Sequence, residues 1–353
     1  MDLIKRLDAL GKVGADENGI TRPHGSDADF DAKTLVASWM KEDGAHVRWD
    51  SHDNVIGRYR GRIDLPTIVV GSHIDTVVNG GKYDGALGVV AGIEAAKALR
   101  GKLEHPLEIV AFSDEEITMS GSKGYVSDSP TPKAFVELHV EQGPVLEHEK
   151  CSVGVVTGVV GQRRVHFTVF GEENHGGTTP MHLRDDALVK AARAIGFINN
   201  LACTSASNLT ATVGELTVSP NKFSIIPGRV DFTLQMRGMD SKDMDDQIDI
   251  IRDVFNFANE ITVSMEPIHC HDEVQNIIRE AAIKEVGHNL VMDLPSRAGH
   301  DAQNFTCPMG MIFVPSRGGI SHSPCEYTSA DMCYSGLNVL IETIKRIDSC
   351  PNL

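Results

Sequence analysis

Short polar clusters along the sequence carry side chains that can bind cations or move protons. Their histidines and carboxylates are His73, Asp84, Glu115, Glu116, His139 and His322. Imidazole and carboxylate groups without a thiolate suit zinc, manganese or nickel better than an iron–sulfur cluster or copper(I). No cluster is decisive alone, but together they indicate a site for divalent cations.

Each cluster also has a plainer interpretation. His73 is a candidate metal ligand, and Asp75 can accept its second ring N–H and so fix the tautomer. H-x-D alone nevertheless favours a surface histidine in a capped turn. Asp84 precedes a predicted helix, so it is either an ordinary helix cap or a carboxylate that bridges two cations.

Three adjacent acids, Asp114, Glu115 and Glu116, directly follow an apolar segment. Neighbouring carboxylates repel one another unless a positive charge lies nearby. The alternatives are a solvated loop, or a site in which Glu116 binds a metal while Glu115 stays free as a base.

Two further clusters lie downstream. His139 shares one face of a predicted strand with Glu137, and polar side chains in an apolar strand are costly unless that face is wet or binds something. His322 follows Gly318 and Gly319, which let the backbone approach a ligand closely.

Strands and helices alternate around the first four clusters. Apolar, β-branched runs predict strands at 67–71, 107–112 and 134–140, and helical spacing predicts a helix at 86–99. This alternation indicates a mixed, mainly parallel α/β sheet. In such sheets, sites form outside the carboxyl ends of the strands, so clusters that are distant in sequence can converge.

The middle of the chain has a different order of elements. Strands are predicted at 164–170, 209–218, 229–236 and 261–265, with helices at 185–201 and 241–258. This β-α-β-β-α-β order is typical of a ferredoxin-like domain. A helix at 273–286, a strand at 310–314 and a helix at 329–347 resume the α/β pattern. We therefore expect a catalytic domain made of residues 1–161 and 271–353, interrupted by an inserted domain at 162–270.

Composition narrows the classes of partner. The formal charge is 33 − 49 = −16, which disfavours nucleic acid and anionic membranes as partners. The first residues lack the apolar core of a signal peptide, no apolar run could span a bilayer, and the seven cysteines form no C-x-x-C pair. We expect a cytoplasmic protein with reduced thiols.

Longer strings resemble a known family. GSHIDTVVNGGKYDGALGV, FSDEE, ELHVEQGPVLE, NHGGTTPM, IPGRVDFTLQMR, GHDAQN and MIFVPSRGGISHSP occur in order. They resemble the N-carbamoyl-L-amino-acid amidohydrolases of the M20 metallopeptidase superfamily, which include allantoate amidohydrolase and yeast-type β-ureidopropionase. The resemblance implies hydrolysis of an N-carbamoyl or other ureido acid to an amino acid, carbon dioxide and ammonia.

The resemblance also implies residue roles. Two divalent ions (Zn, Mn, Ni or Co) would be held by His73, Asp84, Glu116, His139 and His322, with Asp84 as the bridge and Glu115 as the base. The inserted domain would act as a lid and form a homodimer. Its His175 would stabilise the oxyanion, while Asn221 and Arg237 would hold the substrate carboxylate. Gln142 would lie near the carbamoyl end, and Gly318 and Gly319 beside the substrate.

Three features depart from the family pattern. Ile117-Thr118-Met119 stands where the family has a glycine and an Arg-Phe pair, only 22 residues separate Glu116 from His139, and Gly176 replaces an alanine. The alternatives are an M20 aminoacylase or dipeptidase, although these usually have a carboxylate at the position of His139, or a non-catalytic metal-binding protein.

Overall fold

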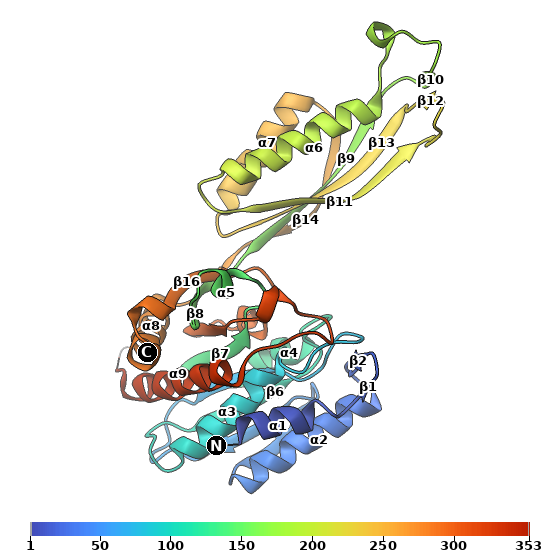
Figure 1. Cartoon of the computed structure of the whole chain (residues 1–353). Helices are drawn as coiled ribbons and strands as arrows, with labels where there is room; N and C mark the ends of the chain where they lie inside the picture. Colours follow the sequence, from blue (N-terminus) through green and yellow to red (C-terminus); the bar gives the residue numbers. More distant parts are fainter. Residues whose placement is uncertain (1, 352) are drawn as a thin grey trace. The chain divides into compact units, whose positions relative to one another are not determined.

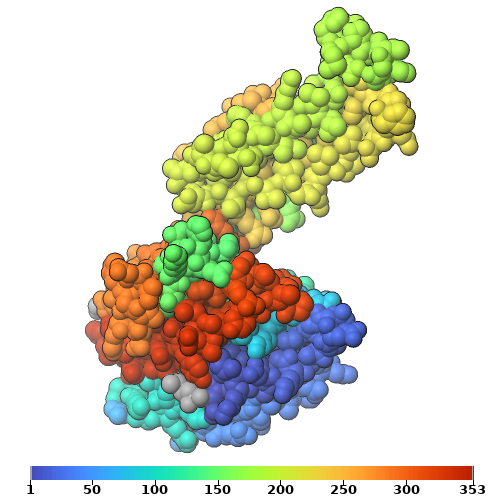
Figure 2. All heavy atoms as spheres, in the orientation of Figure 1, coloured from blue at the N-terminus to red at the C-terminus, as the bar shows by residue number. Residues whose placement is uncertain are grey.

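The structure is a computed structural model that describes residues 2–351 and 353. These fold into two compact units (Figure 1). The first consists of Met1–Gly158 and His269–Leu353, and the second of Val159–Ile268. Both ends of the chain contribute to the first unit, where the N-terminal helix α1 (Leu3–Leu10) contacts the C-terminal helix α9 (Ala330–Ser349), as Figure 2 also shows by colour.

A nine-stranded mixed sheet forms the centre of the first unit. Its strands are β3 (His46–Trp49), β4 (Val55–Tyr59), β5 (Ile68–His73), β6 (Leu107–Phe112), β7 (Ala134–Val140), β8 (Val153–Val159), β15 (Ile268–His269), β16 (Val291–Ser296) and β17 (Met309–Val314). Their order is β15-β8-β17-β7-β5-β6-β4-β3, and β16 also pairs with β8. The predicted α/β class with a mixed sheet is confirmed.

The middle of this sheet is parallel. Strands β17, β7, β5 and β6 run parallel, whereas β8 pairs antiparallel with β17, β4 with β6, and β3 with β4. A short turn can join antiparallel strands such as β3 and β4, but parallel strands need a crossover connection. The sheet is therefore mixed, as expected, with its parallel strands in the middle.

One face of the sheet packs against a helical layer. The layer contains α1, α2 (Asp27–Glu42), α3 (Ala86–Leu99), α8 (Asp272–Val286) and α9. Alternate residues of the central strands, such as Ile109 on β6 and Leu138 on β7, enter the same apolar cluster. Helix α3 is buried along nearly its whole length, which explains why it is apolar all round.

The opposite face of the sheet carries shorter elements. They include α4 (Ser120–Asp128) and the 3-10 turn η3 (Asp301–Asn304), which contact each other. Other short elements of this unit are α5 (Val145–His148) and the 3-10 turns η2 (His288–Leu290) and η4 (Arg317–Gly319). Phe135 on β7 stacks on Phe305, which follows η3, with ring centroids 3.8 Å apart. Although the segment between Glu116 and His139 is short, it contains a helix, α4. The remaining pair of short strands is β1 (Ala15–Asp16) and β2 (Gly19–Ile20).

The second unit is a four-stranded antiparallel sheet with two helices. Its elements are β9 (Gly161–Phe170), α6 (Ala187–Thr204), β11 (Thr210–Ser219), β13 (Arg229–Gly238), α7 (Ser241–Phe255) and β14 (Ala258–Met265). The strand order is β11-β13-β9-β14, and the chain order is β-α-β-β-α-β. A separate core joins the helices to the sheet, with Phe167 stacked on Phe232. A minor ribbon pairs β10 (Asn174–His175) with β12 (Ile225–Ile226), and η1 (Met181–Leu183) lies between β10 and α6.

Within the part of the chain that the structure describes, no helix is both long enough and apolar enough to cross a membrane.

Candidate metal centre

The expected ligands converge at the carboxyl ends of the central strands. His73 is the last residue of β5, His139 is the penultimate residue of β7, and Glu115 and Glu116 follow the end of β6. Because β5, β6 and β7 run parallel, their ends meet at one edge of the sheet. Asp84 reaches the same edge from the segment before α3.

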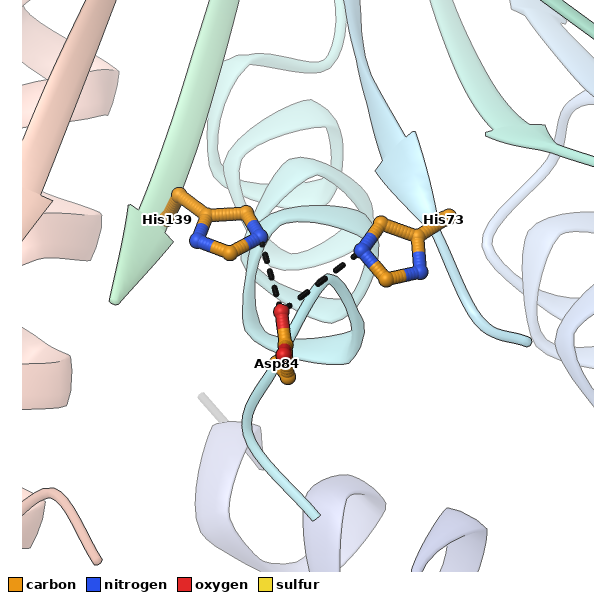
Figure 3. Close-up of side chains that lie close together, drawn as sticks. All are labelled: His73, Asp84 and His139. Atoms are coloured by element: carbon orange, nitrogen blue, oxygen red, sulfur yellow. Dashed lines mark ion pairs between the residues drawn. The ribbon is translucent and has the colours of Figure 1, made fainter. Parts of the chain in front are cut away.

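Asp84 is the centre of the cluster. Its Oδ1 lies 3.6 Å from Nε2 of His73 and 3.1 Å from Nε2 of His139 (Figure 3). Its Oδ2 lies 3.2 Å from Nε2 of His322. The N-cap of α3 is Gly85, and no side chain caps that helix end. The plain interpretation of Asp84 as a helix cap is therefore wrong.

Two groups of side chains that could hold a metal ion share Asp84. One group is His73, Asp84 and His139, and the other is Asp84, Glu116 and His322; the atoms of each group lie within 4.8 Å of one another. In the second group Nε2 of His322 is 3.4 Å from Oε2 of Glu116. Three imidazoles and two carboxylates, one of them the shared Asp84, fit divalent cations of the zinc or manganese type.

The electrostatics of the cluster favour positive charge. Burial raises the pKa of Asp84, but hydrogen bonds with His139, His322 and His73 outweigh it and hold that pKa well below its usual value. Burial lowers the pKa of His139, yet the hydrogen bond with Asp84 raises it to about 9. Buried carboxylates at this density are stable only beside positive charge, which is what a bound cation supplies.

Glu115 lies beside the first group of ligands. Its Oε2 is 3.6 Å from Nε2 of His73, and its side chain is buried. Burial raises the pKa of the Glu115 carboxyl to about 7, even though His73 and His139 act in the opposite direction. A carboxyl group with a pKa near neutrality can both accept and return a proton.

Asp75 contacts His73, Glu115 and Glu116. Its Oδ1 is 3.5 Å from Nδ1 of His73, and the Nδ1 atom also lies 3.1 Å from the Asp75 backbone oxygen. The two carboxylate oxygens accept the backbone N–H groups of Glu115 and Glu116 at 3.4 and 3.3 Å. Asp75 thus contacts both the His73 ring and the turn that carries the two glutamates.

Gln142 and the paired glycines have different surroundings. Gln142 adopts a left-handed backbone (φ 58°), as does His322 (φ 51°), and its Nε2 donates to Oδ2 of Asp84 at 2.9 Å. A cavity of about 210 Å³ is lined by Gln142 and the ligands, but Gly318 and Gly319 do not line it. The Gly318 N–H instead donates to Glu147 at 2.6 Å, and a side chain on Gly319 would collide with the backbone of Pro144.

The other expected site residues belong to the second unit. His175 is exposed on β10, and its Nδ1 accepts N–H groups of the following turn, at 2.9 Å from Gly177. Asn221 has a left-handed backbone (φ 54°) between β11 and β12. Arg237 lies on the central strand β13 opposite Gln162, where burial lowers its pKa.

The sequence patterns did not single out Glu326, which organises the cluster. Its buried Oε2 accepts the N–H groups of Tyr83 at 2.8 Å and Asp84 at 3.2 Å. Its Oε1 accepts the Ser321 hydroxyl at 2.9 Å, and this hydroxyl also lies 3.2 Å from Oδ2 of Asp84. The only feature of the sequence that connects Glu326 with the cluster is its position four residues after His322.

His300 and Glu137 extend the cluster on the other side of His139. The His139 and His300 rings meet edge to face, with centroids 4.5 Å apart. Glu137 is fully buried, and its oxygens accept the Ser72 hydroxyl at 2.7 Å and the Ala302 N–H at 3.0 Å. The string GHDAQN contained His300, but no role followed from it.

Known proteins are similar to this chain along most of its length. Residues 69–346 match peptidase family M20/M25/M40, and the chain belongs to this family. It is 36% identical to an N-carbamoyl-L-amino acid amidohydrolase of Geobacillus stearothermophilus over 400 residues, covering 97% of each chain. It is 33% identical to the allantoate amidohydrolase of Bacillus subtilis over 397 residues, covering 97% of this chain and 96% of that protein.

A solved structure shares the fold. The amidase of the hydantoinase/carbamoylase family from Burkholderia multivorans has 31% sequence identity and a TM-score of 0.88, covering 99% of this chain and 98% of that one. The resemblance noted in the sequence is confirmed. Within its family, the chain is an amidohydrolase that acts on linear amides.

Proposed function

We propose that this enzyme hydrolyses the C–N bond of an N-carbamoyl amino acid or a related ureido acid. Water would attack the carbamoyl carbon, the bond to the amino-acid nitrogen would break, and the released carbamic acid would decompose to carbon dioxide and ammonia. The observation that carries the proposal is Asp84, which two ligand groups share beside Glu115. The names of the relatives support the ureido class of substrate.

The cluster would hold two divalent cations. His73 and His139 would bind one, Glu116 and His322 the other, and Asp84 would bridge them. When bound, such a pair supplies Lewis acidity that polarises a carbonyl and makes water acidic at neutral pH. Asp75 would orient the His73 ring through its second nitrogen.

Glu115 would be the general base. It would take a proton from the attacking water and return it to the leaving nitrogen, which requires a carboxyl whose pKa lies near the working pH. Gln142 would orient the carbamoyl end, because its Oε1 is buried and has no hydrogen-bond partner among the described residues. We keep Gly318 and Gly319 as predicted substrate contacts through their backbone.

Residues 162–270 would supply the remaining contacts. We propose that this domain acts as a lid and forms a homodimer, that His175 stabilises the developing oxyanion, and that Asn221 and Arg237 hold the substrate carboxylate. A planar guanidinium suits this last role, since it can bind both carboxylate oxygens at once. We also place the enzyme in the cytoplasm, a choice supported by its seven unpaired cysteines.

A substrate panel tests the proposal. Ammonia release is measured from N-carbamoyl amino acids and allantoate with zinc or manganese added, beside cleavage of N-acetyl amino acids and dipeptides. We expect ammonia from at least one ureido acid and little cleavage of the other amides. Cleavage of N-acetyl amino acids or dipeptides without ammonia from any ureido acid would assign the enzyme to the aminoacylase or dipeptidase class instead.

A further inference from the structure

A second cavity lies in the first unit, away from the metal centre. Its volume is about 540 Å³, and it opens beside Tyr59 at the end of β4 and Leu107 at the start of β6. Glu115 and Glu116 follow the opposite end of β6, a strand of six residues that is about 17 Å long at the usual rise per residue. The cavity is therefore separate from the catalytic centre.

The lining of this cavity is basic, although the protein as a whole is acidic. The basic residues are His46, Arg58, Arg60, Arg100 and His105, and no Asp or Glu is among the described residues that line it. The whole protein has a formal charge of −16, so the charge at this cavity is opposite in sign to that of the protein as a whole. Apolar side chains, including Leu99 and Leu103, form the remaining wall.

Two of the three arginines have no carboxylate partner among the described residues. Arg58 pairs with Glu108 at 2.8 Å, and His105 contacts the Pro66 carbonyl oxygen through Nδ1 at 2.7 Å. Arg60 and Arg100, in contrast, form no ion pair with any residue between 2 and 351 or with 353. Both are exposed at the cavity and can bind an anion.

The two acids whose charges act on Tyr59 are already paired. Asp43 binds Arg6 at 2.7 Å and Lys97 at 3.5 Å, and Glu94 binds Arg6 at 2.9 Å. The Arg100 guanidinium packs against Gly44, where an added Cβ would lie 2.7 Å from Nη2. Arg100 is thus placed beside the cavity by packing rather than by a salt bridge.

Tyr59 provides an independent sign of a ligand. Its side chain lines the cavity and is only 7% exposed, and its buried hydroxyl has no hydrogen-bond partner among the described residues. Buried polar groups in proteins are nearly always paired, so an unpaired one calls for a missing partner.

We propose that this cavity binds a small organic anion, a carboxylate or phosphate ester with an apolar body. Arg60 and Arg100 would bind the charged group, because guanidinium matches the geometry of carboxylate and phosphate oxygens. The apolar wall would contact the body, and the Tyr59 hydroxyl would gain a partner. The proposal does not depend on which amide the metal centre hydrolyses.

Binding of benzoate and phenyl phosphate to the full-length, metal-loaded enzyme tests the proposal by titration calorimetry at constant ionic strength. We expect saturable binding at millimolar concentrations by at least one probe, and none by the neutral analogue benzyl alcohol. The two probes distinguish a carboxylate from a phosphate ligand. Binding at the metal centre is separated from binding at the cavity by the variants described next.

Arg60→Gln combined with Arg100→Gln should remove the cavity component and leave hydrolase activity unchanged. Arg62→Gln is the matched control, since Arg62 is exposed nearby, pairs with Glu104 at 2.9 Å and does not line the cavity. Each single cavity variant should weaken binding about tenfold, the effect of losing one charged hydrogen bond. Equal loss in the Arg62 control, or no binding that depends on Arg60 and Arg100, would overturn the proposal.

Tyr59→Phe separates a ligand contact from a structural role. Because the hydroxyl has no partner in the described chain, its removal should leave the melting temperature of the ligand-free protein unlowered while weakening probe binding severalfold. A lower melting temperature with unchanged probe affinity would exclude Tyr59 from the site.

Discussion

Replacing Glu326 with glutamine tests whether cation affinity depends on a residue that does not itself belong to either ligand group. The carboxylate accepts two backbone N–H groups, from Tyr83 and Asp84, and one hydroxyl, from Ser321. Glutamine keeps one acceptor oxygen and replaces the other with an NH₂ group. The side-chain volume stays nearly the same, so the change is one of charge and hydrogen bonding.

The magnitude follows from these contacts. Hydrogen bonds to a charged group contribute about 1.5–3 kcal/mol and neutral ones about 0.5–1.5 kcal/mol. We therefore expect the substitution to remove about 1–2 kcal/mol of the free energy that holds the Asp84 segment in its metal-binding position. That corresponds to about a tenfold loss of cation affinity, within the range seen for residues that orient metal ligands. Burial raises the pKa of the Glu326 carboxyl, and the negative charge of nearby Asp84 raises it further. Removing one charge therefore should not destabilise the metal-free protein.

The assay combines metal affinity, by competition with a chromogenic chelator, and thermal unfolding of the chelated protein. Glu147→Gln is the matched control, because the Glu147 carboxylate also accepts a backbone N–H, that of Gly318, but is exposed. We expect weaker metal binding only in the Glu326 variant, with similar melting temperatures for the metal-free proteins. Unchanged metal affinity together with a lower metal-free melting temperature would show that Glu326 only stabilises the fold, and the reasoning would fail.

Further predictions concern catalysis, the ligand geometry and the fold. Glu115→Gln should lower kcat by about 10²–10⁴-fold while metal content by mass spectrometry stays at the wild-type level; an active variant would remove the base assignment. Gly85→Ala should lose metal, because a Cβ there would overlap the His73 ring; wild-type metal content would contradict this. Arg22→Met should lower the free energy of unfolding by about 3 kcal/mol or more, measured in urea, since the backbone carbonyls of Ile74 and Val13 lose their donor and that of Leu10 keeps only the Val13 N–H. Removing the metal with a chelator should lower the melting temperature of the enzyme. The free energy of unfolding should fall by about 2.7 kcal/mol if the cation had been present at 100 times its Kd; an unchanged melting temperature would argue against tight binding.

Continuous apolar runs were the most predictable part of the fold. Helix α3 occupies the predicted residues 86–99, and β6 and β7 occupy 107–112 and 134–140. These elements are buried on all sides, so burial alone dictates their composition. Helix α2 was not assigned, because its many charged residues leave only a narrow apolar stripe. The antiparallel edge strands were missed for a similar reason, since β3 is largely exposed.

The site was predictable where topology dictates it. His73 and His139 converge with Glu116 because their strands are parallel neighbours. The order of the family strings, rather than spacing, was what assigned His322. Glu326 could not be foreseen, because no local pattern tells a buried glutamate from an exposed one. The same holds for the unpaired hydroxyl of Tyr59, which only the packing of its neighbours reveals.

The left-handed backbone at Gln142 and His322 sets a limit on how far this enzyme can be stabilised by mutation. A residue with a Cβ pays about 1–2 kcal/mol in that conformation, which glycine avoids. Selection for heat resistance alone would therefore favour glycine at both positions. Each such gain would delete an imidazole or an amide that lies against Asp84. In laboratory evolution for thermostability, Gln142 and His322 should accordingly stay unchanged when activity is also selected, and should be replaced by glycine when it is not.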